Sequence, residues 1–172
     1  MEFKTIEAKV KENGEKIGFL NKRVFKELAN VISDNEKLYF AVGGTMKKHG
    51  VIAMGVTSIK IHIITEPNAG MALSAIIIPL NRITSVSSTG GVFGGDIQIS
   101  EGTIVHIIKS VLPAIATKAV NAINQALSEQ TSSQPSSQLS QADELLKFKK
   151  LLDDGVLTQD EFDRKKAQIL SL

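Results

Sequence analysis

The stretch KKLLDDGVLTQDEF, at 149–162, places acidic residues around a glycine at a spacing close to the second half of an EF-hand calcium loop. Such a loop takes its ligand oxygens from positions one, three, five, seven, nine and twelve, with glycine at six. With this glycine at position six, Asp154 and Glu161 stand at positions five and twelve, but Lys150 stands at one and Leu152 at three. Because neither lysine nor leucine offers an oxygen, the sequence argues against a calcium site.

The same residues satisfy the rules for two short helices joined by a turn. Gly155 permits the positive φ that ends a helix, and Thr158 forms a capping box with Glu161 at the start of the next helix. Apolar side chains recur at spacings of three and four on both predicted helices. We therefore predict a helical hairpin. We expect its apolar stripes to contact a partner through Leu145, Phe148, Leu152, Phe162 and Ile169.

Two further segments could bind an anion. Residues 89–96, TGGVFGGD, lie between two predicted strands, where a tight hairpin is expected, whereas a phosphate-binding glycine loop opens a helix. Residues 46–50, MKKHG, form a loop whose Lys47, Lys48 and His49 could touch an anionic surface. An exposed polar loop without a ligand is the alternative for the second segment. The next run, GVIAMGV, adds none of the basic residues that a headgroup pocket needs.

The sequence lacks the motifs that are typical of enzymes and metal sites. The chain has no cysteine, which excludes disulfides, thiol nucleophiles and cysteine-ligated metals. The histidines have no acidic residue at ligand spacing, although His62 and His106 could meet across a sheet. Nucleophile elbows, Walker loops and paired catalytic carboxylates do not occur. We expect a non-enzymatic protein with neither a metal nor a cofactor.

The elements that position these segments follow from the apolar periodicity. A stripe from Phe19 to Ile32 predicts an N-terminal helix, and a similar stripe over 112–127 predicts a second amphipathic helix. Between them, short β-prone runs separated by turn residues predict seven antiparallel strands in a sandwich or barrel. The runs are 37–44, 50–56, 58–65, 74–80, 83–89, 95–100 and 103–109. The fold class is therefore α+β, with the second helix capping the sheet.

A change of composition divides the chain. Residues 128–141, SEQTSSQPSSQLSQ, are rich in Ser and Gln and nearly free of apolar side chains, so they predict a flexible linker. We assign 1–128 to a folded body, 129–139 to the linker and 140–172 to the hairpin. Because a segment of about 30 residues rarely folds alone, the hairpin should pack on a copy of itself, on the body or on a partner.

Charge and hydropathy limit the partners. The net charge is +2, which is too small to indicate nucleic acid, and residues 1–128 hold 14 Lys and Arg against 10 Asp and Glu. The N-terminus has no apolar secretory signal, and the longest apolar run, 70–80, is about half the length of a membrane helix. We expect a cytoplasmic protein that could also lie at the inner face of the membrane.

Seven antiparallel strands followed by one helix is the order of elements in pleckstrin-homology-like (PH-like) domains. The segments that carry this resemblance are 55–65, GVTSIKIHIIT, and 76–100, where the pattern I-P-x-x-x-I-T-S-V stands at 78–86. Residues 19–128 thus resemble the bacterial PH-like family, whose members often begin with an extra helix. The resemblance implies a binding module and not an enzyme.

The last 30 residues or so resemble SHOCT, a short C-terminal domain of bacterial and phage proteins. The family's Leu-rich helix, Gly turn, T-x-x-E-F start, Lys-Lys pair and final leucine occur here in that order. They stand at Leu145, Leu146, Leu151, Leu152, Gly155, Thr158, Glu161, Phe162, Lys165, Lys166 and Leu170. The resemblance implies an oligomerisation or interaction element with no catalytic role.

Together these patterns predict an interaction protein of bacterial or phage type. The PH-like body would bind a protein, a peptide or itself, and the tail would join copies or recruit a partner. We expect a homo-oligomer or a complex with another protein, and no nucleic acid. The alternative is a peripheral membrane protein that binds anionic lipid through the 46–50 loop.

Overall fold

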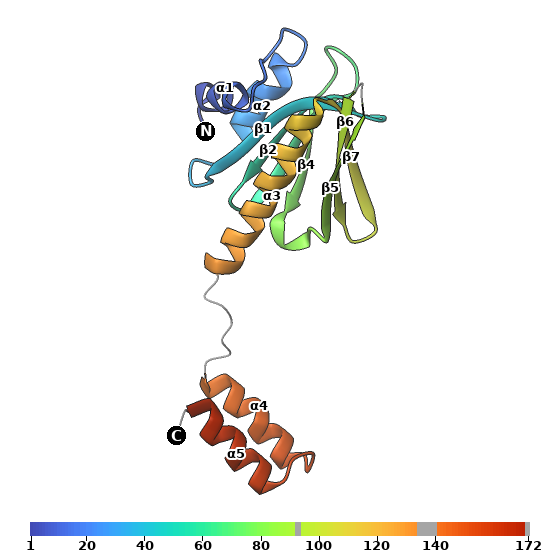
Figure 1. Cartoon of the computed structure of the whole chain (residues 1–172). Helices are drawn as coiled ribbons and strands as arrows, with labels where there is room; N and C mark the ends of the chain where they lie inside the picture. Colours follow the sequence, from blue (N-terminus) through green and yellow to red (C-terminus); the bar gives the residue numbers. More distant parts are fainter. Residues whose placement is uncertain (92–93, 134–140, 171–172) are drawn as a thin grey trace. The chain divides into compact units, whose positions relative to one another are not determined.

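The structure is a computed structural model that describes residues 1–91, 94–133 and 141–170. The chain forms two units, Met1–Gln130 and Thr131–Leu172. The helices are α1 (Phe3–Glu12), α2 (Lys22–Val31), α3 (Pro113–Ser133), α4 (Gln141–Asp153) and α5 (Gln159–Leu170), with one short 3-10 helix, η1 (Leu80–Arg82) (Figure 1). The strands are β1 (Leu38–Met46), β2 (Gly50–Thr57), β3 (Lys60–Glu66), β4 (Ser74–Pro79), β5 (Ser85–Gly91), β6 (Gly94–Glu101) and β7 (Ile104–Val111). All seven predicted strands are confirmed.

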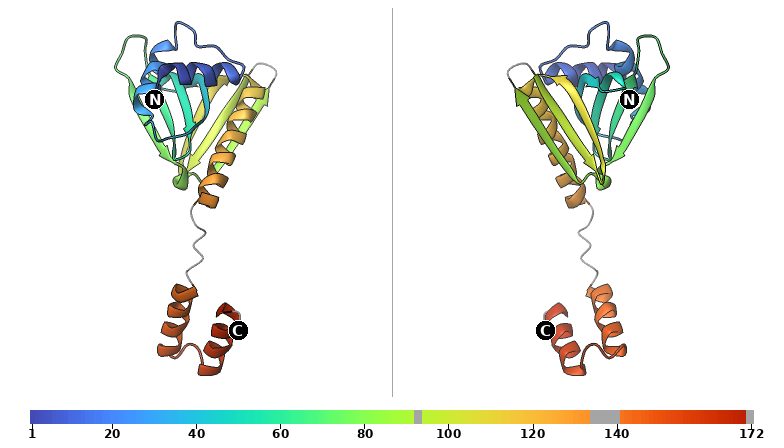
Figure 2. Two further views of the ribbon diagram at one scale, coloured as in Figure 1. Left: turned by 90° about the vertical axis from the view of Figure 1, so that its left-hand side faces the viewer. Right: turned by 90° about the vertical axis from the view of Figure 1, so that its right-hand side faces the viewer.

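The strands form one antiparallel sheet in the order β4-β3-β2-β1-β7-β6-β5. Within the described residues, β1 and β7 share a single register pair, Thr45–Lys109, whereas the other neighbouring strands pair along most of their lengths. The two halves, β1 to β4 and β5 to β7, diverge in Figure 2. The strands β4 and β5 remain the edges. The sheet is therefore not closed into a barrel, which was one of the two forms that the strand spacing left open.

Helix α3 covers the inner side of the bent sheet, as the sequence predicts. Its apolar face packs with side chains of both halves in one core, so the open sheet still has a closed interior. The residues of this face recur at spacings of three and four and are Ile115, Ala116, Ala119, Ile123 and Ala126. Because the helix fills the space between the halves, the edge strands do not need to meet.

The N-terminal helices cover the opposite face of β1, β2 and β3. A second core joins α1, α2 and these strands, and it contains Ile6, Val10, Val24, Phe25, Leu28, Ala29, Ile32, Ala41, Ala53 and Ile64. The three strands are thus buried on both faces. Double burial explains why β2 is nearly continuous in apolar residues, where a strand with one solvent face would alternate.

The observed helix α2 is shorter than the apolar stripe that predicts it. Helix α2 begins at Lys22, so Phe19 and Leu20 lie in the preceding loop and are exposed. Helix α1 was not predicted. Only Ile6 and Val10 of its residues are buried. Phe3, which packs against the same core, precedes them at the helical spacing of i, i+3 and i+7, so this short signal could have predicted the helix.

The end of helix α3 includes residues 129–133, which composition assigned to the linker. The carboxylate of Glu129 accepts a hydrogen bond from the Tyr39 hydroxyl and another, at 2.8 Å, from Gln125 Nε2. The first of these bonds fastens the end of the helix to β1. Composition could not reveal it, because the two residues are 90 positions apart. The rest of the predicted linker, 134–139, lies outside the described residues.

Helices α4 and α5 form the predicted helical hairpin. Gly155 has a φ of 71° and ends the first helix. The Thr158 N–H donates to Glu161 Oε2 at 2.9 Å, and the Glu161 N–H donates back to Thr158 Oγ1 at 3.4 Å. This reciprocal pair is a capping box. The predicted turn and helix start are therefore confirmed.

The glycine-rich segment 89–96 joins β5 to β6. Its register pairs Thr89 with Asp96 and Gly91 with Gly94, which makes it the predicted hairpin between two strands. Residues 92–93 lie outside the described residues. Because no helix follows this segment in the fold, it lacks the helix N-terminus that a phosphate-binding glycine loop uses.

Candidate binding pocket

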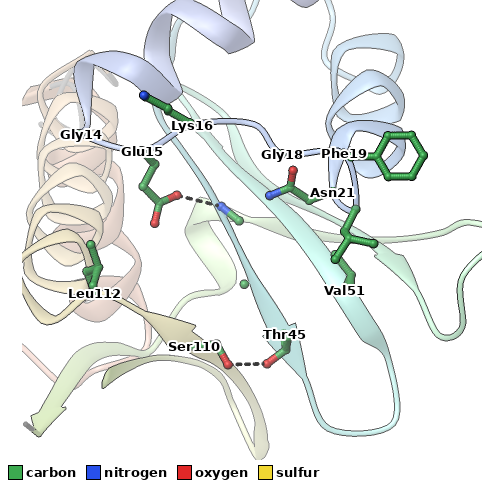
Figure 3. Close-up of a pocket in the computed structure, with 13 residues that line it drawn as sticks. Gly14, Glu15, Lys16, Gly18, Phe19, Asn21, Thr45, Val51, Ser110 and Leu112 are labelled. Carbon is green, nitrogen blue, oxygen red and sulfur yellow. Dashed lines mark hydrogen bonds between the residues drawn. The ribbon is translucent and has the colours of Figure 1, made fainter. Parts of the chain in front are cut away.

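A pocket of about 590 Å³ opens between the α1–α2 loop and the junction of β1 with β7 (Figure 3). Its lining consists of Gly14, Glu15, Lys16, Gly18, Phe19, Leu20, Asn21, Gly43, Gly44, Thr45, Val51, Ser110 and Leu112. The pocket coincides with the place where the two halves of the sheet share their single register pair. The bend of the sheet thus contributes to the hollow, and the loop forms one side of it.

Two glycines of β1 make the close approach of the pocket walls possible. A Cβ atom at Gly43 would lie 3.1 Å from Asn21 Nδ2. A Cβ atom at Gly44 would lie 2.8 Å from Ile108 Cγ2 and 2.8 Å from the Lys109 carbonyl oxygen. Glycine is the residue that lets another chain segment approach a strand so closely. Backbone atoms of β1 therefore form part of the pocket wall.

Glu15 brings a carboxylate into the pocket from the α1–α2 loop. This side chain is half-buried, and its Oε2 accepts a hydrogen bond of 3.4 Å from the Gly43 N–H (Figure 3). Burial raises the pKa of Glu15 above its ordinary value, and the bond from Gly43 offsets part of the rise. A partly desolvated carboxylate gains from a ligand that brings a hydrogen-bond donor or a positive charge.

Three uncharged polar side chains also face the pocket. Asn21 Oδ1 is buried and accepts no hydrogen bond from the described residues. The hydroxyls of Thr45 and Ser110 lie 3.0 Å apart, and Ser110 has a left-handed φ of 62° (Figure 3). A buried carbonyl oxygen is costly to leave unpaired, so Asn21 can accept a hydrogen bond from a ligand or from solvent.

The rim of the pocket is apolar. Phe19, Leu20 and Leu112 expose 94%, 77% and 61% of their surfaces. These side chains would lose water contact when a ligand covered them, which favours binding. The described pocket residues contain no nucleophile paired with a base. The arrangement can therefore bind through hydrogen bonds and apolar contacts, and it offers no constellation for acyl or phosphoryl transfer.

The predicted anionic-surface residues lie together in the turn between β1 and β2. Lys47 and Lys48 are exposed, and His49 is half-buried. The turn is next to the pocket, because Thr45 and Val51 on either side of it line the wall. None of the described helices has both the length and the apolar character needed to cross a bilayer. Contact of this turn with an anionic surface stays a prediction.

The five predicted contact residues of the tail belong to α4 and α5, and we call the surface that they form the seam. All five are half-buried, and the α4 members share one helix face; they are Leu145, Phe148, Leu152, Phe162 and Ile169. Leu146 and Val156, which sequence reasoning did not assign to the contact, expose 64% and 68% of their surfaces. The role of the seam in binding a partner stays a prediction.

Both strand histidines have acidic neighbours that sequence spacing did not reveal. His62 Nε2 lies 2.8 Å from Glu36 Oε2, and His106 Nε2 lies 3.7 Å from Glu101 Oε2. The histidines do not meet each other, because β2 and β1 separate β3 from β7. The described part of the chain brings together no group of three His, Cys, Asp or Glu side chains able to hold a metal ion.

The sequence of the capped hairpin matches the model of a known family. Residues 143–170 match the model of SHOCT, the short C-terminal domain. The predicted resemblance of the tail is thereby confirmed, and the SHOCT match begins within α4 and ends with α5. The family's description states a size and a position and no activity. No curated protein matches the chain.

Proposed function

We propose that this chain is a cytoplasmic, non-enzymatic interaction protein whose SHOCT hairpin joins copies of the chain. One observation carries the proposal: none of the side chains described over 145–169 is fully buried. Two helices without a buried side chain have no core of their own. A second hairpin packed on the seam would supply that core, as in a four-helix bundle.

For the body, we propose a PH-like binding module whose ligand site is the pocket. The support is the order of elements, seven antiparallel strands and then a covering helix, together with the pocket's lining. A peptide segment fits this lining, because its N–H groups could donate to Glu15 and Asn21 while an apolar side chain covers Leu112. Joining several bodies through their tails would strengthen such weak contacts by avidity.

Size-exclusion chromatography with light scattering tests the assembly. We expect the full chain at a multiple of its 18.6 kDa mass. The variant with Phe148→Ser and Leu152→Ser should elute as a single chain, since the seam would no longer attract a second hairpin. A matched control, Lys147→Ser with Lys150→Ser, alters exposed residues of the same helix and should keep the wild-type mass. A wild-type protein with the mass of one chain at all concentrations would contradict the proposal.

A further inference from the structure

Phe19 and Leu20 form an unusual surface feature at the loop between α1 and α2. They expose 94% and 77% of their surfaces, more than Ile104 and Val105, which expose 53% and 52% on β7. The ring of Phe19 projects from the loop in Figure 3. Two adjacent large apolar side chains that contribute so little to the core suggest an external apolar partner.

Basic side chains surround this apolar pair. Lys22, Arg23 and Lys26 line a second hollow of about 420 Å³ together with Phe19 and Leu20. Lys16 lines the first pocket with them, and the Lys47–Lys48 turn lies beside that pocket. We call this surface the loop tip, defined as Phe19, Leu20, Lys16, Lys22, Arg23, Lys26, Lys47 and Lys48.

The positive charge of the body is concentrated at the loop tip. Four of its basic side chains line the two hollows together with the acidic Glu15 and Glu66, and Lys47 and Lys48 add two charges from the neighbouring turn, so the net charge is +4. Residues 1–128 hold 14 Lys and Arg against 10 Asp and Glu, which is also +4. The rest of the body is therefore neutral. Within the described residues, the five lysines of the loop tip form no ion pair.

The loop that carries the apolar pair is fastened to the body at both ends. Before it, the Asn13 side chain donates to the Ala41 carbonyl oxygen at 3.0 Å in a buried bond. After it, Arg23 pairs with the carboxylate of Glu66 and donates to the Met71 carbonyl oxygen at 2.8 Å. These bonds anchor both ends of the loop, so a partner would have less of the loop to order on binding.

We propose that the loop tip binds the surface of an anionic lipid bilayer. Phe19 and Leu20 enter the boundary between headgroups and acyl chains, and the lysines meet the anionic headgroups. A bilayer matches both observations at once, because it places an apolar layer directly beneath a layer of negative charge. The inference is independent of the hairpin, although joined copies would bind a membrane more tightly by avidity.

Flotation of the full chain with lipid vesicles tests the inference. We expect at least about tenfold tighter binding to vesicles with one third phosphatidylglycerol than to pure phosphatidylcholine, and clear weakening in about 0.5 M salt. Phe19→Ser with Leu20→Ser should weaken binding at least about tenfold, since the apolar contribution is lost. Lys22→Gln with Lys26→Gln should weaken it by about 25-fold, at roughly fivefold per lysine.

Two matched controls accompany these variants. Ile104→Ser with Val105→Ser removes exposed apolar surface elsewhere on the body, and Lys149→Gln with Lys150→Gln removes exposed charge from the tail. Both should bind vesicles within about twofold of the wild type. All eight substituted residues are exposed, so circular dichroism should report folded proteins throughout. If the double variant at the loop unfolds, Phe19→Ser alone provides the same comparison.

Three results would overturn the inference. One is equal binding to neutral and anionic vesicles, and another is unchanged binding of the Phe19 and Leu20 variant. The third is a change of oligomeric mass in that variant without a change in vesicle binding, which would make the loop tip a protein contact. The hairpin variants at Phe148 and Leu152 test the proposed assembly separately, so each proposal can fail without the other.

Discussion

The ring of His62 and the carboxylate of Glu36 lie 2.8 Å apart, from Nε2 to Oε2, and both side chains are buried. Glu36 also accepts a hydrogen bond of 2.7 Å from the Thr57 hydroxyl, and Lys60 Nζ lies 3.3 Å from its other oxygen. The segment between α2 and β1 is thereby bonded to β2 and β3. Because this cluster satisfies its own charges away from the pocket, we assign it to the stability of the body.

Glu36 should make the stability of the protein depend on acidity. Burial, the largest single effect, raises the pKa of Glu36, but hydrogen bonds from Thr57 and His62 outweigh it and lower the pKa below 4.5. A carboxyl with a lowered pKa in the folded state adds stability above its unfolded pKa and loses it as the pH falls through the folded value. The free energy of unfolding should therefore fall below about pH 4.5.

Urea unfolding of the wild type and of Glu36→Gln, from about pH 3 to pH 7, measures this contribution. At neutral pH the variant should lose about 2 kcal/mol, because a buried charge-assisted hydrogen bond is removed. It should also lose part of the acid dependence. Glu7→Gln, at an exposed site on α1, should leave both unchanged. An acid dependence that is identical in the wild type and Glu36→Gln would show that the cluster does not control it.

Tyr39 should titrate at a pH above the ordinary range for tyrosine. Burial, followed by the hydrogen bond to Glu129 and its negative charge, raises the pKa of Tyr39 above 10.0. The chain has one tyrosine and no tryptophan, so ultraviolet absorbance follows this phenol alone. Glu129→Gln should lower the midpoint, since it removes the hydrogen bond and the negative charge, whereas burial and the opposing effect of Lys37 remain. An unchanged midpoint would contradict the contact between α3 and β1.

Gly50 and Gly70 should differ sharply in their tolerance of alanine. Both have left-handed φ values, 68° and 83°. A Cβ atom at Gly50 would overlap the Glu66 carbonyl oxygen and lie 2.6 Å from that of Pro67, whereas one at Gly70 would meet nothing within 4 Å. Gly70→Ala should cost about 1 kcal/mol of unfolding free energy through backbone strain. Gly50→Ala should cost at least twice as much in urea unfolding, and equal losses would refute the steric argument.

The capping box should control the first turn of α5. Thr158→Ala removes the N-cap hydroxyl, so the amides of that turn should exchange with solvent about fivefold faster in NMR measurements. Hydrogen bonds from the Thr158 N–H and then its hydroxyl lower the pKa of Glu161. The cap should therefore weaken as the pH falls through that lowered value. Gln168→Ala, at an exposed site near the end of α5, should leave the first turn unchanged.

The sequence predicts where the strands lie, but it predicts only partly which face of each strand is buried. Alternation along 58–65 predicts Ile59, Ile61 and Ile63 on one face and Lys60 and His62 on the other. Ile61 and Ile63 do lie in one core, whereas Ile59 precedes β3 and is exposed. His62 is nevertheless buried, because Glu36 pairs with it and the helices α1 and α2 cover much of the outer face of the sheet. The sequence contains the residues of α1 and α2, but its periodicity does not predict which surface of the sheet these helices will cover.

The sequence by itself determined the features that depend on near neighbours. The turn at Gly155, the capping box of Thr158 and the seven strand runs each rest on interactions within a few residues, which local rules describe well. Only the tertiary structure decided the pocket, the exposed loop tip, and the pairings of Glu36 with His62 and of Glu129 with Tyr39. The two pairings join residues 26 and 90 positions apart. Such contacts arise from packing the helices and the bent sheet together, and spacing along the chain does not encode that packing in any simple way.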